Sequence, residues 1–259
     1  MLNIVIPLAG KGSRFLAAGF NTPKPLIAVD NAPVISYVIA NLTPAQPHRF
    51  IFLCLAEHLA RHGLARVLED LAPGCVIIPV TEVTAGAACT VLLARGYINN
   101  PEPLMIANGD QLVDTDIDLY LRSMGNADGL IMTMRADDPK WSFVRLDGRG
   151  RVIEVAEKKV VSNEATVGIY NFRHGSYFVD AAEQMLKKDL RVNGEFYVAP
   201  VYNEMAAKGR EIIIFSAGGE FDGMYGLGIP ADVERFAELN IARRFLKGAP
   251  RRKSGPPER

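Results

Sequence analysis

The sequence predicts an α/β fold of three layers, in which helices cover both faces of a mostly parallel, mixed central sheet. Two observations support this prediction. In the first half of the chain, short runs rich in Val, Ile and Leu alternate with segments of helical periodicity, and the helices that connect parallel strands cover both faces of a sheet. In the second half, four β-rich runs follow one another with few helices between them. We therefore expect the sheet to be extended there by strands of mixed direction.

The expected strands of the first half are short, continuously apolar and bounded by Pro, Gly or Asn, as strands buried on both faces are. They cover residues 2–8, 49–55, 74–80 and 103–107. Helical spacing of apolar residues occurs between them, over 34–42 and within 86–98. The later elements are strands over 130–135, 142–146, 152–155 and 166–172, helices over 177–188 and 198–208, a strand over 211–215 and a closing helix over 232–246.

The size and charge of the chain limit its organisation and its partners. With 259 residues it is long enough for one large domain with a substantial core, and we expect a single domain over residues 1–247. Residues 248–259 are Pro-rich, basic and without apolar periodicity, so a disordered tail is expected. The 29 basic and 29 acidic residues cancel. Because no net field would attract nucleic acid or an anionic membrane, we expect neither as a partner.

Cysteine and histidine spacing predicts no metal or redox motif. Cys54, Cys75 and Cys89 stand singly in apolar segments and are expected to be buried small hydrophobic residues. His58 and His62 are four residues apart but lack the glutamate of a zinc-protease motif, so a solvated helix face is expected. The N-terminus lacks the features of a secretory signal and no run is long enough for a membrane span. We expect a cytoplasmic location, and a homo-oligomer is left open.

A glycine-rich cationic loop, PLAGKGSRF over residues 7–15, directly follows the first expected strand. Ligands of open parallel sheets bind beyond the carboxyl ends of the strands. Gly10 and Gly12 allow backbone N–H groups to approach phosphate oxygens closely, and Lys11 and Arg14 supply positive charge. The loop lacks the third glycine of a dinucleotide fingerprint and the Gly-Lys-Ser/Thr of a Walker loop. A plain solvated turn is the alternative for this loop taken alone.

Lys24 lies between two prolines, Pro23 and Pro25. Each proline fixes its own φ and favours extended backbone at the residue before it, so we expect Lys24 on a stiff segment that positions its amine. A plain turn before the next strand is the alternative, but it leaves the neighbouring cationic loop unexplained.

Together, these two motifs resemble the signature of the sugar-phosphate nucleotidyltransferase family. Further segments are similar to that family in the same order. They are Thr84-Ala85-Gly86-Ala87-Ala88, similar to the loop along the base and ribose; Asn108-Gly109-Asp110, similar to the metal-binding strand end; and Glu157-Lys158 before Val167-Gly168-Ile169-Tyr170, similar to the sugar-phosphate segment. The resemblance spans roughly residues 2 to 235, a combination more specific than any single motif. It implies the Rossmann-like fold of nucleotide-diphospho-sugar transferases.

The resemblance implies a reaction between a nucleoside triphosphate and a phosphorylated acceptor, with release of pyrophosphate. The acceptor's phosphate oxygen is already an anion near neutral pH, so no general base is required. The obstacle is the repulsion between two anionic substrates. Catalysis then consists of cancelling charge and fixing an in-line geometry.

The resemblance also assigns roles to individual residues. Arg14 and Lys24 are the implied catalytic cations: Arg14, with Lys11, holds the β- and γ-phosphates, and Lys24 bridges the α-phosphate and the incoming phosphate. The implied nucleotide-binding residues are Leu8, Ala9, Gly10, Lys11, Gly12, Ser13, Arg14, Thr84, Gly86, Ala87, Asn108 and Gly109. The implied acceptor-binding residues are Glu157, Lys158, Gly168 and Glu195. Glu195 could equally be an early-helix acid that the helix dipole favours.

Magnesium is the implied cofactor, with Asp110 as its ligand, because Mg²⁺ usually takes one or two carboxylates plus phosphates and water. The alternative is that Asp110 caps a turn, as Asp114 and Asp116 are expected to cap a helix. The chain departs from the family near its end, where Gly226 stands in place of a second metal-binding aspartate. Asp222 is the candidate replacement; without it, the metal would rest on Asp110 and substrate oxygens.

Three hypotheses for the function follow. The first is a nucleotidyltransferase that activates a sugar-1-phosphate or a similar phosphorylated metabolite for capsular polysaccharide or glycoconjugate synthesis. The segment NGEFYVAPVYNEM is also similar to relatives that transfer cytidylyl groups to non-sugar phosphates, and the base of the triphosphate is left open. The second is a nucleotide-sugar-using glycosyltransferase, which would leave Lys24 without a triphosphate to neutralise. The third is a non-catalytic nucleotide-binding regulator, suggested by the missing second aspartate.

Overall fold

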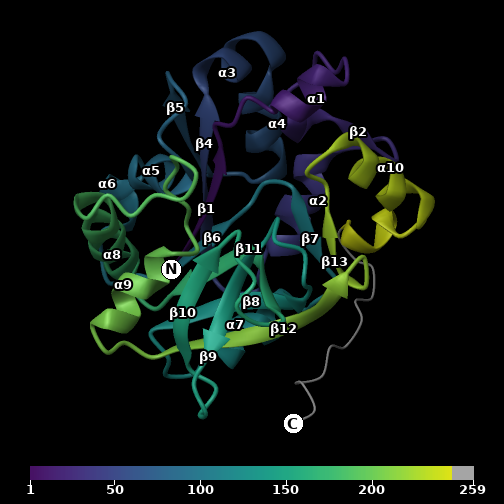
Figure 1. Cartoon of the computed structure of the whole chain (residues 1–259). Coiled ribbons are helices and arrows are strands. Elements are labelled where there is room, and N and C mark those ends of the chain that lie inside the picture. Colours follow the sequence, from purple (N-terminus) through teal and green to yellow (C-terminus); the bar gives the residue numbers. More distant parts are fainter. Residues whose placement is uncertain (247–259) are drawn as a thin grey trace.

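A computed structural model describes residues 1–246 and shows a mixed central sheet with helices on both of its faces (Figure 1). The strands are β1 (Leu2–Leu8), β2 (Ala28–Val29), β3 (Ala32–Pro33), β4 (His48–Leu55), β5 (Val76–Val80), β6 (Leu104–Ala107), β7 (Gln111–Val113), β8 (Gly129–Arg135), β9 (Ser142–Leu146), β10 (Val152–Glu157), β11 (Glu164–Phe172), β12 (Ile212–Glu220) and β13 (Gly223–Gly226). The helices are α1 (Ser13–Ala17), α2 (Val34–Leu42), α3 (Ala56–His62), α4 (Leu64–Leu71), α5 (Ala87–Leu92), α6 (Arg95–Ile98), α7 (Ile117–Ser123), α8 (Gly175–Lys187), α9 (Val201–Ala207) and α10 (Pro230–Glu238), with 3-10 turns η1 (Lys24–Leu26) and η2 (Ala242–Phe245).

The order of the strands confirms the predicted α/β fold with a mixed sheet. It runs β5-β4-β1-β6-β11-β8-β12-β13-β7, and β9 and β10 attach through β11. From β5 to β6 the neighbouring strands are parallel, whereas β11 is antiparallel to both β6 and β8. This sheet includes every strand from β1 to β13 within residues 1–246 except β2 and β3, which pair with each other in a small second sheet.

Two apolar layers, one on each face of the sheet, account for the continuously apolar strands. Along β1, Ile4 and Ile6 pack into one layer and Val5 into the other, because successive side chains of a strand point to opposite faces. The first layer includes buried residues of α2, α7 and α10, and the second includes buried residues of α5, α8 and α9. Helices therefore exclude water from both faces, as the sequence pattern predicts.

The sheet topology brings four distant segments to one edge. β1 and β6 are parallel neighbours, so the loops that follow Leu8 and Ala107 lie beside each other. β11 runs antiparallel to β6 and places Gly168 next to Asn108, whose backbone N–H donates to the Gly168 carbonyl at 2.9 Å. β13 pairs with β7, with Gly226 opposite Gln111.

Several predicted elements differ in detail from the structure. The helical segment predicted within residues 86–98 is two short helices, α5 and α6, and the closing helix ends at Glu238 before η2. Lys24 begins a 3-10 turn instead of an extended segment. Pro23 is extended (φ −54°, ψ 139°), and its carbonyl accepts a hydrogen bond from the Leu26 N–H at 2.8 Å, which closes the turn.

The short strand β7 was missed because three residues carry no periodicity. Its edge is satisfied by a buried side chain of α2: the Asn41 amide donates to the Val113 carbonyl at 2.8 Å, and the Asn41 side-chain oxygen accepts from the Val113 N–H at 2.9 Å. An amide side chain thus replaces a neighbouring strand and satisfies both backbone groups of Val113.

The remaining expectations have mixed outcomes. Cys54 is buried, whereas Cys75 and Cys89 are only partly buried. Burial raises the pKa of all three thiols, that of Cys54 to about 12.

Asp116 caps α7, and its carboxylate accepts hydrogen bonds from the backbone of the first turn. No helix within residues 1–246 has the length and apolar character that crossing a bilayer requires. The predicted tail, residues 248–259, lies outside the described residues.

Candidate active site

A cleft of about 400 Å³ opens where β1 and β6 end. Its walls come from the glycine-rich loop, η1, the segment before α5 and the loop between β6 and β7. The lining residues are Pro7, Leu8, Ala9, Gly10, Gly12, Lys24, Pro25, Val83, Thr84, Gly86, Ala87, Thr90, Asn108, Gly109, Asp110 and Glu195. Most of the residues that the sequence predicts for nucleotide binding therefore share one cavity.

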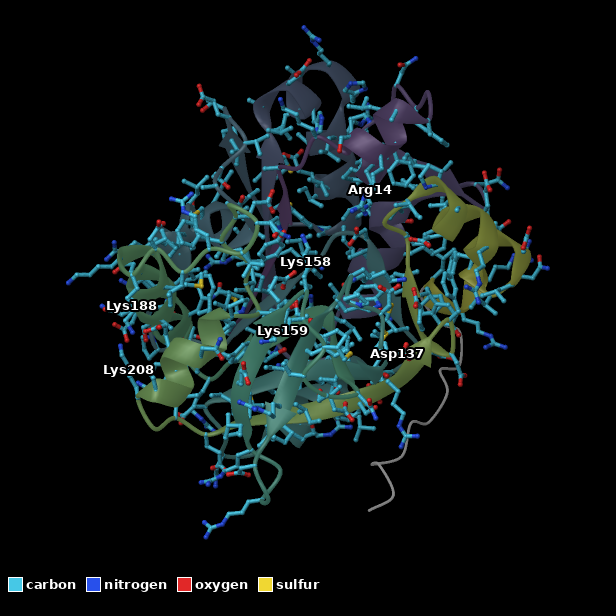
Figure 2. The ribbon with its side chains drawn as sticks, in the orientation of Figure 1. Arg14, Asp137, Lys158, Lys159, Lys188 and Lys208 are labelled. Atoms are coloured by element: carbon cyan, nitrogen blue, oxygen red, sulfur yellow. The ribbon has the colours of Figure 1, made fainter. Side chains whose placement is uncertain are left out.

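The glycine-rich loop turns sharply at Gly12, which has a left-handed conformation (φ 63°) and precedes α1. A Cβ at Gly12 would lie 3.7 Å from the Cβ of Lys24, so the loop and η1 run close together. The two predicted cations of this loop, Lys11 and Arg14, differ in where they lie. Lys11 lines a second cleft that adjoins the first, whereas Ser13 and Arg14 are exposed on α1 and line neither cleft. Figure 2 marks the position of Arg14.

Lys24 points into the site and forms an ion pair with Asp110. The pair is mostly shielded from solvent, with 21% of the lysine side chain and 26% of the aspartate side chain exposed. The Lys24 amine also lies 5.8 Å from the centre of the Phe15 ring. A short 3-10 turn, an aromatic ring and a carboxylate thus fix the amine at the junction of both clefts, which it lines.

The segment after β6 is held by close packing. A Cβ at Gly109 would lie 2.3 Å from a methyl group of Leu8, so only glycine lets β1 and this segment approach so closely. The Asn108 side chain donates to the side-chain oxygen of Gln111 at 3.1 Å. At Gly168 (φ 78°), a Cβ would collide with both of these side chains, at 2.0 Å from Gln111 and 2.3 Å from Asn108. The β-bulge of β11 at this position therefore packs directly against the floor of the site.

The loop before α5 is bonded to the segment that contains Glu195. The Phe196 N–H donates to the Ala85 carbonyl at 2.8 Å, and the Ala88 N–H donates to the Phe196 carbonyl at 3.0 Å. Gly86 lies between these bonds with φ 125° and ψ 170°, a conformation almost restricted to glycine. The predicted nucleotide loop and the predicted acceptor segment therefore form one unit.

Lys158, at the end of β10, is held in an unusual backbone conformation beside a tyrosine. Its φ is 54°, and its N–H donates to the Trp141 carbonyl at 3.0 Å. The Lys158 amine donates to the Tyr197 hydroxyl at 2.6 Å and lies 4.8 Å from the centre of that ring. This hydrogen bond raises the pKa of Lys158, so the amine is charged at neutral pH. Left-handed conformations of residues other than glycine concentrate at functional sites.

Glu157 is more deeply placed than its neighbour. It accepts a hydrogen bond from the Ser142 hydroxyl. Burial raises the pKa of Glu157, and this effect is opposed by the Ser142 hydrogen bond and the charge of Lys158. The negative charge of Glu195 also acts on Glu157 and raises its pKa. These residues, with Tyr197, gather two carboxylates, one amine and two hydroxyls on the acceptor side predicted from the sequence.

Asp222, the predicted second metal ligand, is not brought to Asp110. It precedes β13, whose other end, Gly226, pairs with Gln111 beside Asp110. Gly226 lies four positions after Asp222 in extended backbone, a distance of about 13 Å. The carboxylate of Asp232, at the start of α10, faces the same glycine as that of Asp110: a Cβ at Gly228 would lie 3.6 Å from an Asp110 side-chain oxygen and 3.7 Å from an Asp232 side-chain oxygen.

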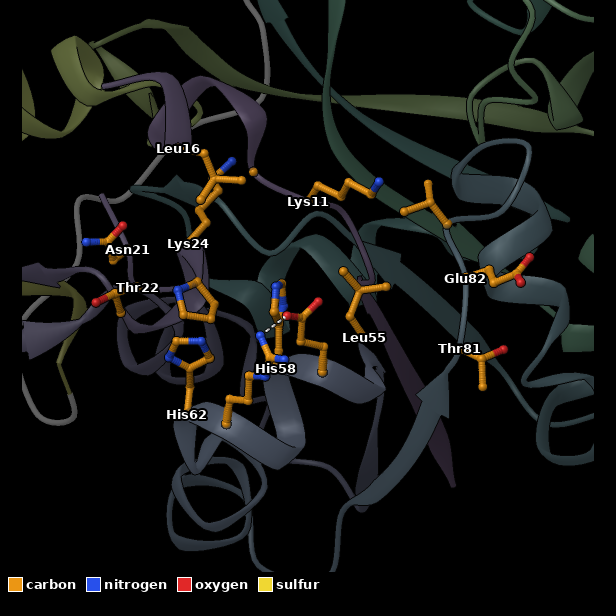
Figure 3. A pocket seen from close by; sticks show the side chains of 15 residues that line it. Lys11, Leu16, Asn21, Thr22, Lys24, Leu55, His58, His62, Thr81 and Glu82 are labelled. Carbon is orange, nitrogen blue, oxygen red and sulfur yellow. Dashed lines mark hydrogen bonds and ion pairs between the residues drawn. The ribbon is translucent and has the colours of Figure 1, made fainter. Parts of the chain in front are cut away.

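The second cleft, of about 880 Å³, shares Gly12, Lys24 and Val83 with the first. Figure 3 shows that the side chains of α3 line this cleft below Lys24. Among them are His58 and His62, so the expectation that they lie on a simple solvated helix face is incomplete. Burial and the neighbouring His62 lower the pKa of His58, which keeps its imidazole neutral at neutral pH.

Sequence reasoning missed Tyr197 and Asp232. Tyr197 is two residues from Glu195 and belongs to the quoted NGEFYVAP segment, so that segment already contained a signal. Asp232 follows Pro230 at the start of α10, where an acid reads as a simple helix-stabilising residue. Its position near Gly228 depends on the turn at Leu227, whose N–H donates to the Asp110 carbonyl at 2.7 Å.

Known proteins match this chain in sequence. A family model described as nucleotidyl transferase matches residues 4–203. The bifunctional protein GlmU of Cupriavidus pinatubonensis is 25% identical over 256 residues, which are 95% of this chain and 54% of that protein. The chain thus spans about half the length of the curated relatives it matches.

Solved structures share the fold. A nucleoside-diphosphate-sugar pyrophosphorylase from Vibrio cholerae RC9 superimposes with a TM-score of 0.78 at 23% identity, covering 91% of this chain and 99% of that one. The inositol-1-phosphate CTP transferase from T. maritima superimposes with a TM-score of 0.75 at 18% identity, covering 96% and 97%. Both confirm the predicted fold class.

Proposed function

The chain belongs to the nucleotidyl transferase family, and we propose that it transfers a nucleotidyl group from a nucleoside triphosphate to a phosphorylated small metabolite, with release of pyrophosphate. The observation that carries the proposal is the Lys24–Asp110 pair at the mouth of a cleft whose walls are the glycine-rich loop and the Thr84–Ala87 loop. An amine and backbone N–H groups can bind phosphate oxygens, and a carboxylate can hold the cation that accompanies a triphosphate.

The proposed reaction uses fixed charge. The acceptor's phosphate oxygen attacks the α-phosphorus, the bond to the bridging oxygen of the β-phosphate breaks, and pyrophosphate leaves. We expect Lys24 to contact both the α-phosphate and the incoming phosphate, and Lys11 to hold the β- and γ-phosphates from the adjoining cleft. Because Asp110 and the η1 turn already hold the Lys24 amine, the proposed reaction would require little reorganisation of this charge as the leaving group forms. Arg14 would join them only if its exposed side chain turned toward the loop.

Magnesium fits the chemistry of the donors at this edge, since Asp110 offers the carboxylate oxygens that Mg²⁺ prefers. Among residues 1–246, no cluster of three acidic, histidine or cysteine side chains could hold a metal by protein groups alone. A magnesium ion held by one or two carboxylates and by phosphate oxygens needs no such cluster. When bound, the ion would neutralise phosphate charge.

The acceptor would bind between β11 and the Glu195–Tyr197 segment. Lys158 would contact its phosphate, and Glu157 and Glu195 would accept hydrogen bonds from its hydroxyl or amino groups. A sugar-1-phosphate or a related small phosphate presents both kinds of group. The product, an activated nucleoside diphosphate derivative, would supply polysaccharide or glycoconjugate synthesis.

A pyrophosphate-release assay tests the proposal. CTP, UTP, dTTP and GTP are each combined with a panel of sugar-1-phosphates, phosphocholine and related phosphates. We expect pyrophosphate to appear only when both substrates are present. Release that needs a nucleotide-sugar, or nucleotide binding without any release across the panel, would instead support a glycosyltransferase or a regulator.

Replacement of Lys158 by methionine should raise the KM of the acceptor about 10- to 100-fold, because it removes a charged hydrogen bond worth about 1.5–3 kcal/mol. The KM of the triphosphate should change less than about threefold. Steady-state kinetics with each substrate varied in turn measures both. The neighbouring variant Lys159→Met serves as the control for loss of a positive charge. Equal changes in both KM values for Lys158→Met would show that Lys158 is not specific to the acceptor.

A further inference from the structure

We propose that Asp232 is the second carboxylate of the magnesium site and acts with Asp110 across the space left open by Gly226 and Gly228. This inference rests on the proposed function, because it concerns the cation that accompanies the triphosphate. It assigns a ligand role to the first turn of α10, at a residue six positions after Gly226 in the chain.

The geometry places both carboxylates around the same glycine. A Cβ at Gly228 would lie 3.6 Å from an oxygen of Asp110 and 3.7 Å from an oxygen of Asp232, and a Cβ at Gly226 would lie 3.9 Å from the same oxygen of Asp232. Neither glycine has a positive φ, so the backbone does not require glycine at these positions. The missing side chains therefore have a different consequence: they leave open a space that oxygens of both Asp110 and Asp232 face.

Backbone contacts fix the relative position of the two acids. The Leu227 N–H donates to the Asp110 carbonyl at 2.7 Å, and the Asp232 N–H donates to the Ile229 carbonyl at 3.1 Å. The segment from Gly226 to Asp232 is thus anchored to the Asp110 backbone, and it brings the Asp232 carboxylate near Gly226 and Gly228. Hydrogen bonds hold the backbone at both Asp110 and Asp232. Each aspartate would therefore lose less conformational freedom when it binds a cation.

The donor set suits magnesium. Two carboxylates, with the remaining positions taken by phosphate oxygens and water, are the usual ligands of Mg²⁺ at nucleotide sites. Asp110 also pairs with Lys24, and a carboxylate has acceptor positions for both an amine and a cation. Positive charge from Lys24 and from the ion would then act on the same phosphate groups.

Asp232 also occupies the third residue of α10, where an acid stabilises the start of a helix. If that were its only role, replacing it would change stability and leave cation binding intact. The two roles are therefore separated by measuring the affinity for a cation directly.

The experiment titrates Mn²⁺ into the full chain without nucleotide and measures bound Mn²⁺ by electron paramagnetic resonance and water-proton relaxation. We expect wild-type protein to bind one Mn²⁺ and both Asp110→Asn and Asp232→Asn to weaken binding about tenfold or more, since each removes one of two charged ligands. Glu234→Gln, which neutralises an exposed acid of the same helix, should stay within about twofold of wild type. Circular dichroism confirms that each variant is folded.

A rescue variant makes the test specific. The double variant Gly226→Asp/Asp232→Asn moves the carboxylate from position 232 to position 226, whose Cβ would lie close to the Asp232 side chain. We expect this double variant to regain most of the Mn²⁺ affinity that Asp232→Asn loses. Unchanged affinity in Asp232→Asn, or no Mn²⁺ binding by wild type, overturns the inference. Because the titration needs no turnover, it stands apart from the pyrophosphate assay, whose failure would overturn the proposed function instead.

Discussion

Lys24→Ala is expected to lower kcat about a hundredfold or more, since the loss of one preorganised charge donor typically costs about 2.7 kcal/mol or more in the transition state. The structure gives the reason. The Lys24 amine is held by Asp110 and the η1 turn, and it lines both clefts. No other lysine within residues 1–246 lines both clefts. Steady-state kinetics with the substrate pair found in the pyrophosphate screen measures the effect.

The fold should survive this substitution. The ion pair is partly exposed, so its loss should change the free energy of unfolding by about 1 kcal/mol or less. Urea denaturation monitored by circular dichroism checks this. Lys187→Ala, at an exposed position on α8, is the matched control and should keep wild-type turnover. A loss below about threefold in Lys24→Ala would show that the assigned role of Lys24 is wrong.

The order of strands and helices was predictable because the early strands are buried on both faces. A strand such as β1 is continuously apolar only when helices cover both faces of the sheet. This local pattern therefore predicts how the helices are arranged around the sheet. The stiffness of the Lys24 segment also follows from its prolines. The 3-10 turn at Lys24 could not be predicted from the prolines, because one hydrogen bond, from the Leu26 N–H to the Pro23 carbonyl, closes that turn.

The position of Asp232 near Gly226 could not be predicted, because distance in the chain is a poor guide where strands intervene. Asp222 is only four residues from Gly226, but an extended strand moves those residues about 13 Å apart. Asp232 is six residues from Gly226 and returns to it through the turn that begins α10. The contact depends on pairing between β13 and β7, two short strands whose association no local pattern specifies.

The same limit applies to the union of the nucleotide loop and the acceptor segment. Residues 85–88 and residue 196 are more than a hundred positions apart, and two backbone hydrogen bonds join them. The sequence predicted that each segment contacts a substrate. It gave no indication that one segment supports the other.

Gly86→Ala should therefore impair the binding of both substrates and lower stability. A Cβ at this position would lie 2.4 Å from the Phe196 carbonyl oxygen and 2.5 Å from its nitrogen. These atoms belong to backbone and cannot rotate away. The φ of 125° adds strain of about 1–3 kcal/mol for any residue with a side chain. With the loss of the flanking hydrogen bonds, we expect the free energy of unfolding to fall by about 3 kcal/mol or more.

The kinetic consequence distinguishes this variant from a generally weakened protein. If the Thr84–Ala87 loop and Glu195 move apart, the KM of the triphosphate and the KM of the acceptor should both rise, about tenfold each, at temperatures where the variant is still folded. Gly96→Ala is the control, because Gly96 is exposed on α6 and a Cβ there meets nothing within 4 Å; it should leave both KM values unchanged. If the two segments support each other, breaking their contact should displace both of them and raise both KM values. A rise in only one KM would mean that the two segments act independently.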